Sequence, residues 1–141
     1  AKIVHLTVYL GVLYSGQKSS NSELRTPHSE LRTPHSELRI YYHDPCYLSR
    51  RLNVIEEPRK ILQSLGYNVI ELLNSKQNTR CCGHGGLLPE TYPLIAERIA
   101  RERISEARAL GAKIIVTACP ECKTFLSLVS DDIKVVDILD L

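Results

Sequence analysis

Five cysteines, all that the chain contains, stand in three short groups whose residue types can bind a metal or carry out thiol chemistry. Cys46 ends the string His-Asp-Pro-Cys, Cys81 and Cys82 open Cys-Cys-Gly-His-Gly-Gly, and Cys119 and Cys122 bound Cys-Pro-Glu-Cys. Each group is bounded by glycine or proline and follows an apolar run. We therefore expect three loops to bring the five thiols into one site, which would be the centre of the function.

Three kinds of chemistry fit this set of thiols. An iron–sulfur cluster is held by cysteine thiolates, whereas a zinc ion takes four ligands in a tetrahedron and would leave one cysteine over. A Cys-x-x-Cys pair such as Cys119 and Cys122 can instead act as a redox-active dithiol. The plainest alternative is a group of buried cysteines without any ligand. The residues by themselves do not decide between an iron–sulfur cluster, a zinc site and a redox-active dithiol.

The residues around the cysteines favour a site that accepts a bulky anionic group. Gly83, Gly85 and Gly86 tolerate positive φ, so the backbone can turn tightly and approach an inorganic core. Pro120 suits the first position of a helix, which would place Cys122 in its first turn. The free N–H groups at such a helix start point toward anionic sulfur.

The segments that must position these loops alternate between strand and helix patterns. Residues 39–45 contain the β-formers Ile40, Tyr41 and Tyr42, and the run ends at Pro45 just before Cys46. A helix is expected from Pro58, with Gly66 as its C-terminal cap, and a strand over residues 67–73 follows. A polar stretch over residues 74–80 then leads to the adjacent cysteines.

The second half repeats the alternation. The longest helix is expected over residues 89–110, where Gly111 is the stop signal. Its expected apolar face consists of Ile95, Ile99, Ile104, Ala107 and Leu110, and Glu97 and Arg101 form a favourable i,i+4 pair. Residues 113–118 predict a strand buried on both faces, and residues 133–136 a last short strand.

This order of elements predicts an α/β fold with three layers: a mainly parallel four-stranded sheet with helices on both faces. Ligands of such sheets collect beyond the carboxyl ends of the strands. Cys46 and Cys119 directly follow expected strands, and Cys81 and Cys82 lie on the loop after another. The cysteine site is therefore expected at the carboxyl ends of the strands.

The first 39 residues differ from this pattern. Residues 1–18 predict a helical segment, with leucines and a tyrosine at helical spacing. Residues 19–39 contain the repeated heptapeptide Ser-Glu-Leu-Arg-Thr-Pro-His, whose prolines interrupt any helix, and predict a low-complexity linker. The chain begins with Ala1 and contains no methionine, so we expect a fragment or the tail of a longer protein.

Composition excludes several classes of protein. The 141 residues are 43% hydrophobic and 24% charged, as in one ordinary globular domain with an appendage. The net charge of only +2, with basic residues spread among acidic ones, indicates no nucleic-acid partner. No apolar run approaches the roughly 18 residues of a transmembrane segment. An odd number of cysteines fits a reducing compartment, so we expect a cytoplasmic location, with peripheral attachment to a membrane complex left open.

The motifs Tyr-His-Asp-Pro-Cys-Tyr-Leu, Cys-Cys-Gly-x-Gly-Gly and Ala-Cys-Pro-x-Cys resemble a known family. Residues 40–141 are similar to the cysteine-rich CCG domain of heterodisulfide reductase and of the iron–sulfur subunits of glycolate oxidase and related enzymes. The resemblance implies an α/β fold and a non-cubane 4Fe-4S cluster. Carried over by position, the implied ligands are Cys46, Cys81, Cys82, Cys119 and Cys122.

The resemblance also implies a function. It predicts an iron–sulfur oxidoreductase subunit that transfers electrons, and that reduces a disulfide if it acts as heterodisulfide reductase does on the mixed disulfide of coenzymes M and B. Family members commonly carry a second such domain and a ferredoxin-like module, so the electrons would come from an iron–sulfur or flavin subunit. The alternative is a zinc-binding structural or docking module of a larger redox complex.

Two further sets of residues near the cysteines are candidates for the site. His43 could donate a proton to a leaving thiolate or lie beside cluster sulfur, unless Asp44 simply caps the turn and His43 packs against it. Arg50, Arg51 and Arg80 flank the cysteine loops and could offset negative charge, or could lie on the solvated surface.

Overall fold

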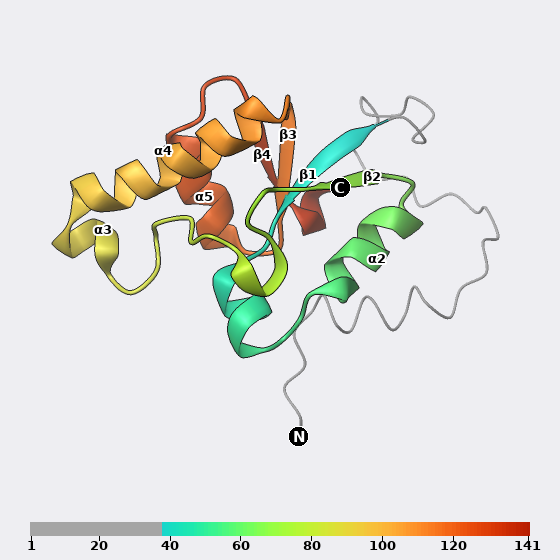
Figure 1. Ribbon diagram of the computed structural model, residues 1–141, viewed down its shortest axis with the longest axis horizontal. Helices are drawn as coiled ribbons and strands as arrows, with labels where there is room; N and C mark the ends of the chain where they lie inside the picture. The colour runs from blue at the N-terminus through green and yellow to red at the C-terminus, as the bar shows by residue number, and fades with distance from the viewer. Residues whose placement is uncertain (1–37) are drawn as a thin grey trace.

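The computed structural model describes residues 38–141. The expected helical segment at residues 1–18, and the repeat at 19–39 up to residue 37, lie outside the described residues. The elements follow in the order β1 (Arg39–His43), η3 (Tyr47–Arg51), α2 (Glu56–Ser64), β2 (Asn68–Glu71), η4 (Lys76–Asn78), α3 (Leu88–Thr91), α4 (Pro93–Ala109), β3 (Ile114–Thr117), α5 (Pro120–Leu128), β4 (Lys134–Asp137) and η5 (Ile138–Asp140) (Figure 1).

The four described strands form one parallel sheet in the order β2-β1-β3-β4. The chain moves from β1 outward to β2, and then returns across β1 to reach β3 and β4. The strand order therefore reverses between β1 and β3, which is where open α/β sheets bind their ligands. In this central pair Tyr41 is the register partner of Ile115, and His43 that of Thr117. The predicted α/β fold with a parallel four-stranded sheet is confirmed.

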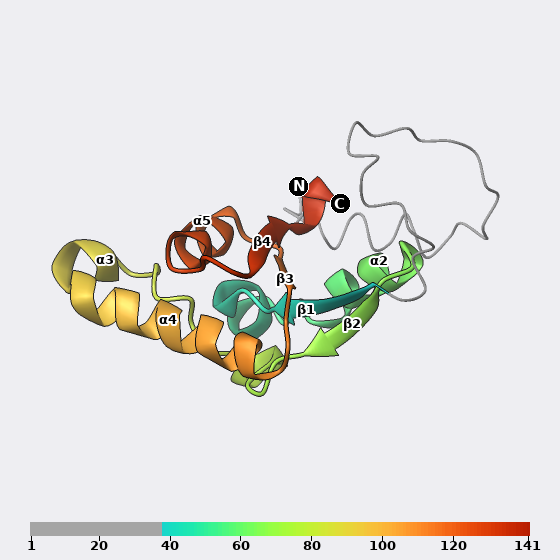
Figure 2. The same cartoon turned by 90° about the horizontal axis from the view of Figure 1, so that it is seen from above.

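Helices cover both faces of the sheet, as the sequence predicts. On one face α4 and α5 contribute Ala100, Ile104, Cys122 and Leu126 to a core with Tyr41 and other strand residues. On the other face α2 and the π-helical turn η3 contribute Ile61, Leu62 and Leu48. Both views place α4 and α5 beside each other and apart from α2 (Figures 1 and 2). Among the described residues, no helix has the length and apolar character needed to cross a membrane.

The glycines expected to end α2 and α4 do so. Gly66 and Gly111 have φ of +88° and +80°, the left-handed conformation in which a Cβ atom is disfavoured. The N–H of Ala112 donates to the Ala107 carbonyl and that of Gly111 to Arg108, the hydrogen bonds of a Schellman motif. This turn directs the chain from α4 straight back into β3, the strand that leads to Cys119.

The helix expected over residues 89–110 is divided in two. Tyr92 has φ −140° and ψ 66° because the following proline disfavours helical geometry, so α3 ends and α4 begins at Pro93. The expected apolar face is also partly wrong. Ile104 and Ala107 are buried, but Ile95 is 45% exposed and Leu110 36% exposed. The buried side of α4 instead includes Ala96 and Ala100, whose small side chains allow close helix–sheet packing, and also Arg103.

Candidate metal centre

The three cysteine groups meet at the carboxyl ends of β1 and β3. Cys46 follows β1 and is the N-cap residue of η3, while Cys119 follows β3 and is the N-cap residue of α5. Cys122 lies in the first turn of α5, behind Pro120 at the first helical position as expected. Cys81 and Cys82 lie on the loop between η4 and α3. Because β1 and β3 are adjacent and parallel, the loops that follow them lie at the same end of the sheet.

The five thiols form a chain of contacts from the core to the surface. Hydrogen bonds join Cys81 with Cys82, Cys82 with Cys122, and Cys122 with Cys119, and Cys46 is close enough to Cys81 for their charges to interact. Cys82 and Cys122 are buried, and the other three are partly exposed. All five are free thiols. The cysteines that the sequence singled out are thus brought together in one place.

These contacts favour the thiolate at two positions. Hydrogen bonds from the thiols of Cys122 and Cys81 hold the pKa of Cys82 well below its usual range. The Cys122 thiol, aided by the amide groups of Glu121 and Cys122, lowers the pKa of Cys119 to about 6 although burial acts the other way. The pKa values of Cys81 and Cys122 are raised, because hydrogen bonding to the neighbouring cysteines and burial both favour the protonated thiol at these two positions. Thiolate is the form of cysteine that binds metals, and metal binding by a thiol releases its proton.

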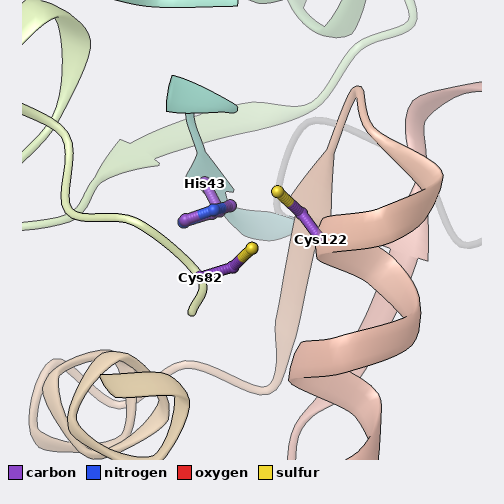
Figure 3. Close-up of side chains that lie close together, drawn as sticks. All are labelled: His43, Cys82 and Cys122. Carbon is purple, nitrogen blue, oxygen red and sulfur yellow. The ribbon is translucent and has the colours of Figure 1, made fainter. Parts of the chain in front are cut away.

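His43 lies next to the two buried cysteines. A ring nitrogen of His43 and the Sγ atoms of Cys82 and Cys122 all lie within 4.8 Å of one another (Figure 3). The three side chains come from the end of β1, the cysteine-rich loop and the first turn of α5, and they point toward one another. His43 is fully buried, and burial lowers its pKa. The structure therefore places His43 beside two of the five cysteines.

Arg103, which the sequence analysis missed, contacts His43 from the other side. Its Nε donates to His43 Nδ1 over 3.1 Å, and its Nη1 pairs with Glu106 at 2.8 Å. Arg103 is 0% exposed, which is rare for a guanidinium. The sequence held one signal: Arg103 stands three residues after Ala100 and four before Ala107, on the side of α4 that faces the sheet.

Asp44 connects two of the three cysteine loops. Its carboxylate accepts hydrogen bonds from Arg59 on α2 at 2.9 and 2.8 Å, and from the backbone N–H of Lys76 at 2.7 Å. Its backbone carbonyl accepts the Thr79 hydroxyl at 3.0 Å. The segment after β1, which carries Cys46, is therefore attached to the segment that leads to Cys81. Arg59 and Thr79 were also missed, since neither is near Asp44 in sequence.

The arginines predicted to flank the site have other partners or face solvent. Arg50 donates to the carbonyl of Thr79, Arg80 pairs with Glu102 at 3.6 Å, and Arg51 is exposed. Arg50 therefore stabilises the loop that precedes Cys81, and Arg80 lies on a half-exposed surface. His84, which follows the cysteine pair, connects the loop to α5, because its Nδ1 lies 2.8 Å from a carboxylate oxygen of Glu121.

Gly83 is required by close packing next to the cysteine pair. It has φ +95°, and a Cβ atom there would lie 2.4 Å from the backbone carbonyl oxygen of Ala96 on α4. Its N–H also donates to Cys81 Sγ over 3.3 Å. Gly86 has positive φ in open space, whereas Gly85 has neither positive φ nor a close neighbour. The expectation that all three glycines allow special backbone geometry therefore applies to Gly83 and Gly86 only.

Three buried polar atoms at this edge of the sheet lack a hydrogen-bond partner within the described part of the chain: His43 Nε2, Arg103 Nη2 and Thr117 Oγ1. His43 and Thr117 are register partners, so their side chains leave the sheet on the same face. Buried groups without partners are uncommon in folded proteins and call for a specific explanation. Imidazole, guanidinium and hydroxyl groups can each donate a hydrogen bond.

Comparison with known proteins gives the same family as the motifs. The family model of the CCG cysteine-rich domain matches residues 40–127. A subunit of dihydromethanophenazine:CoB–CoM heterodisulfide reductase from Methanosarcina barkeri is 38% identical over 107 residues, 72% of this chain and 26% of its own. A subunit of fumarate reductase (CoM/CoB) from Methanothermobacter marburgensis is 37% identical over 107 residues, 72% of this chain and 22% of its own.

A third relative, a probable iron–sulfur-binding oxidoreductase from Bacillus subtilis, is 33% identical over 109 residues, 72% of this chain and 16% of its own. This chain thus spans at most 26% of the length of these three relatives. The residues that the family model matches, 40–127, include the three cysteine motifs. The family inferred from the motifs is confirmed: the chain belongs to the cysteine-rich CCG domain family.

Proposed function

We propose that this chain is the cluster-binding domain of an iron–sulfur oxidoreductase, with an iron–sulfur cluster of the non-cubane 4Fe-4S type as its cofactor. The proposed ligands are Cys46, Cys81, Cys82, Cys119 and Cys122. One observation carries the proposal: five free cysteines from three separate loops converge where the strand order of the sheet reverses.

The chemistry of the site fits such a group. The donor set consists of soft thiolate sulfur, which iron–sulfur clusters require. Two of these thiols, Cys82 and Cys119, have lowered pKa values in the metal-free protein. The buried donors without partners, on His43, Arg103 and Thr117, have the polarity needed beside thiolate and sulfide anions. Because a zinc ion takes four ligands, five cysteines exceed what a single zinc needs.

The reaction class is proposed from the relatives' names together with this site. When bound, the cluster would supply one-electron transfer. Reduction of a disulfide to two thiols consumes two electrons and two protons, so an iron–sulfur or flavin partner subunit must supply electrons twice per turnover. His43 is the candidate catalytic residue, because it is the fully buried polar side chain beside Cys82 and Cys122.

A zinc-binding structural module is the second candidate, and one observation favours it. His43, Cys82 and Cys122 place three ligand atoms within 4.8 Å of one another, as a tetrahedral zinc site requires. One of the partly exposed cysteines would complete that site. In this case the domain would dock within a redox complex without carrying electrons itself.

Metal analysis of the full chain, purified without oxygen, separates these functions. Iron with acid-labile sulfide and visible charge-transfer absorption supports the cluster, whereas zinc without sulfide supports the structural module. The decisive variants are Cys46→Ser, Cys82→Ser and Cys119→Ser, each of which should lower iron and sulfide together because serine is a poorer ligand for this soft site. Ser127→Ala, on the exposed side of the helix that carries Cys122, is the matched control and should keep full occupancy.

The alternatives predict different patterns in the same experiment. Zinc would be released by substitution of its ligands only, so at least one of the five cysteine variants would retain all of its metal. A dithiol enzyme would depend on Cys119 and Cys122 alone. Full iron occupancy in the double variant Cys46→Ser, Cys82→Ser would overturn the five-ligand cluster.

A further inference from the structure

The hydrogen bond between Arg103 and His43 determines which nitrogen of the imidazole carries a proton. A guanidinium has only donors and stays protonated in proteins, so Arg103 Nε must be the donor in its 3.1 Å contact with His43 Nδ1. His43 Nδ1 must therefore present a lone pair. A doubly protonated imidazolium has no such lone pair. In a neutral ring protonated on Nδ1, the N–H of His43 would point at the N–H of Arg103, and no hydrogen bond could form.

The remaining proton must therefore be on Nε2. Nε2 is also a buried atom without a hydrogen-bond partner among the described residues, so an N–H group there is free to donate to an acceptor bound at this site. Since Nδ1 is engaged by Arg103, Nε2 is the ring nitrogen left to face sulfur, and the Sγ atoms of Cys82 and Cys122 lie within 4.8 Å of a ring nitrogen of His43. The ring thus presents an N–H group, not a lone pair, to the two buried sulfur atoms shown in Figure 3.

Arg103 is itself held in this orientation. Glu106, one turn further along α4, pairs with its Nη1 at 2.8 Å, and the Glu106 carboxylate also accepts the N–H of Asn74 at 3.3 Å. The side chains of Arg103 and Glu106 are 0% and 7% exposed. A buried guanidinium between a carboxylate and an imidazole has little freedom to turn, so the hydrogen bond to Nδ1 is built into the fold rather than made by a mobile surface residue.

We propose that Arg103 is a positioning residue that fixes His43 as the Nε2–H tautomer, so that His43 donates a hydrogen bond to sulfur at the cysteine site and does not ligate metal. The part that concerns bound metal rests on the proposed cluster; the tautomer does not. A metal-binding histidine needs the lone pair that Nε2 lacks here. An N–H donor to sulfur lowers the electron density there, and hydrogen bonds of this kind help to set cluster potentials.

Nitrogen-15 NMR of the metal-free full chain tests the tautomer directly. Two-bond ¹H–¹⁵N spectra give a pyrrole-type shift for the protonated ring nitrogen and a pyridine-type shift for the other, and the spectrum of His43→Gln identifies the His43 signals. We expect Nε2 to be pyrrole-type and Nδ1 pyridine-type in the wild type. A pyrrole-type Nδ1 in the wild type would overturn the proposal, whether or not any variant folds.

Variants of Arg103 show whether the arginine causes this preference. Arg103→Met keeps a long side chain but removes the donor, so the two tautomers should become mixed, whereas Arg103→Lys retains a donor and should largely restore the wild-type spectrum. If Arg103→Met keeps the pure Nε2–H tautomer, Arg103 is not the positioning residue. If Arg103→Met does not fold, the spectrum of Arg103→Lys tests the role of Arg103 instead. Lysine also donates at this position, so Nδ1 of His43 should remain unprotonated, and a protonated Nδ1 in Arg103→Lys would overturn the proposal.

Iron-loaded protein tests the second half of the proposal. His43→Leu removes the donor and should leave iron and sulfide unchanged but shift the midpoint potential downward, and His43→Gln, whose amide N–H lies near the position of Nε2, should restore part of the shift. Loss of metal in His43→Leu as large as in Cys82→Ser would show that His43 is a ligand and would overturn the proposal. A wild type that binds no iron would defeat the proposed function but not the NMR result.

Discussion

Asp44 and Arg59 form a buried, bidentate ion pair at the base of the cysteine site. Two guanidinium nitrogens of Arg59 lie 2.9 and 2.8 Å from the two carboxylate oxygens of Asp44, and the side chains are 5% and 1% exposed. Asp44 also binds the segment that leads to Cys81, through Lys76 and Thr79. This pair therefore positions two of the three cysteine loops relative to each other.

The first prediction concerns this pair. Asp44→Asn keeps the shape of the side chain but leaves a buried guanidinium without the more deeply buried of its two carboxylate partners, a loss that typically costs about 3–5 kcal/mol. We expect the lower end of that range, because Arg59 retains Glu71 at 2.6 Å. Urea unfolding of the metal-free protein measures the change in the free energy of unfolding.

The control for this prediction is Asp132→Asn. Asp132 pairs with Arg108 at 2.6 Å, but both side chains are about half exposed and screened by solvent, so its loss should change the free energy of unfolding far less than Asp44→Asn does. Equal losses in the two variants would mean that the buried pair has no special role. The iron content of Asp44→Asn, measured after reconstitution, should also fall, because Cys46 and Cys81 lose their common support.

The second prediction uses the three glycines of the cysteine-rich loop as an internal series. Gly83→Ala combines positive φ with a clash against the Ala96 carbonyl oxygen, and should cost on the order of 3 kcal/mol or more together with loss of bound metal. Gly86→Ala has positive φ but open space, and should cost about 1–2 kcal/mol. Gly85→Ala should stay within about 0.5 kcal/mol. Thermal unfolding should therefore give the lowest Tm for Gly83→Ala, an intermediate Tm for Gly86→Ala, and a Tm close to that of the wild type for Gly85→Ala.

The third prediction tests the packing of α4 on the sheet. Ala100 is fully buried in the core that contains Tyr41 and Cys82, so Ala100→Leu should destabilise the protein by about 1–3 kcal/mol through overpacking. Ala109→Leu, on the same helix but exposed, is the matched control and should change the free energy of unfolding by less than about 0.5 kcal/mol. A silent Ala100→Leu would mean that α4 does not lie against the sheet at this point.

The fourth prediction concerns removal of the metal. Because ligand binding to the folded state adds to stability, iron-loaded protein should unfold at higher denaturant than the same protein after chelation. The difference should reach about 2.7 kcal/mol if the metal is present at about one hundred times its Kd. Cys82→Ser should not respond to chelation. A loaded and a chelated wild type that unfold together would argue against a metal that binds only the folded domain.

Several features of this protein follow from sequence alone. The five cysteines were recognisable as one site because each group follows an apolar run, and the carboxyl ends of parallel strands share one edge of a sheet. Gly66 and Gly111 were recognisable as helix ends because only a residue without a Cβ atom adopts their positive φ at little cost. These are local rules, and each depends on residues close together in the chain.

The tertiary structure alone decided the partners of the buried charges. Arg59 lies 15 residues from Asp44, and Arg103 lies 60 residues from His43. Whether they meet depends on strand order and on the rotation of α2 and α4 about their axes. The rotation of α4 was wrongly predicted from Ile95 and Leu110, because its alanines allow closer packing on the sheet than larger side chains would. Periodicity records which residues can share a face, but the free energy of packing against the rest of the fold selects the face that is buried.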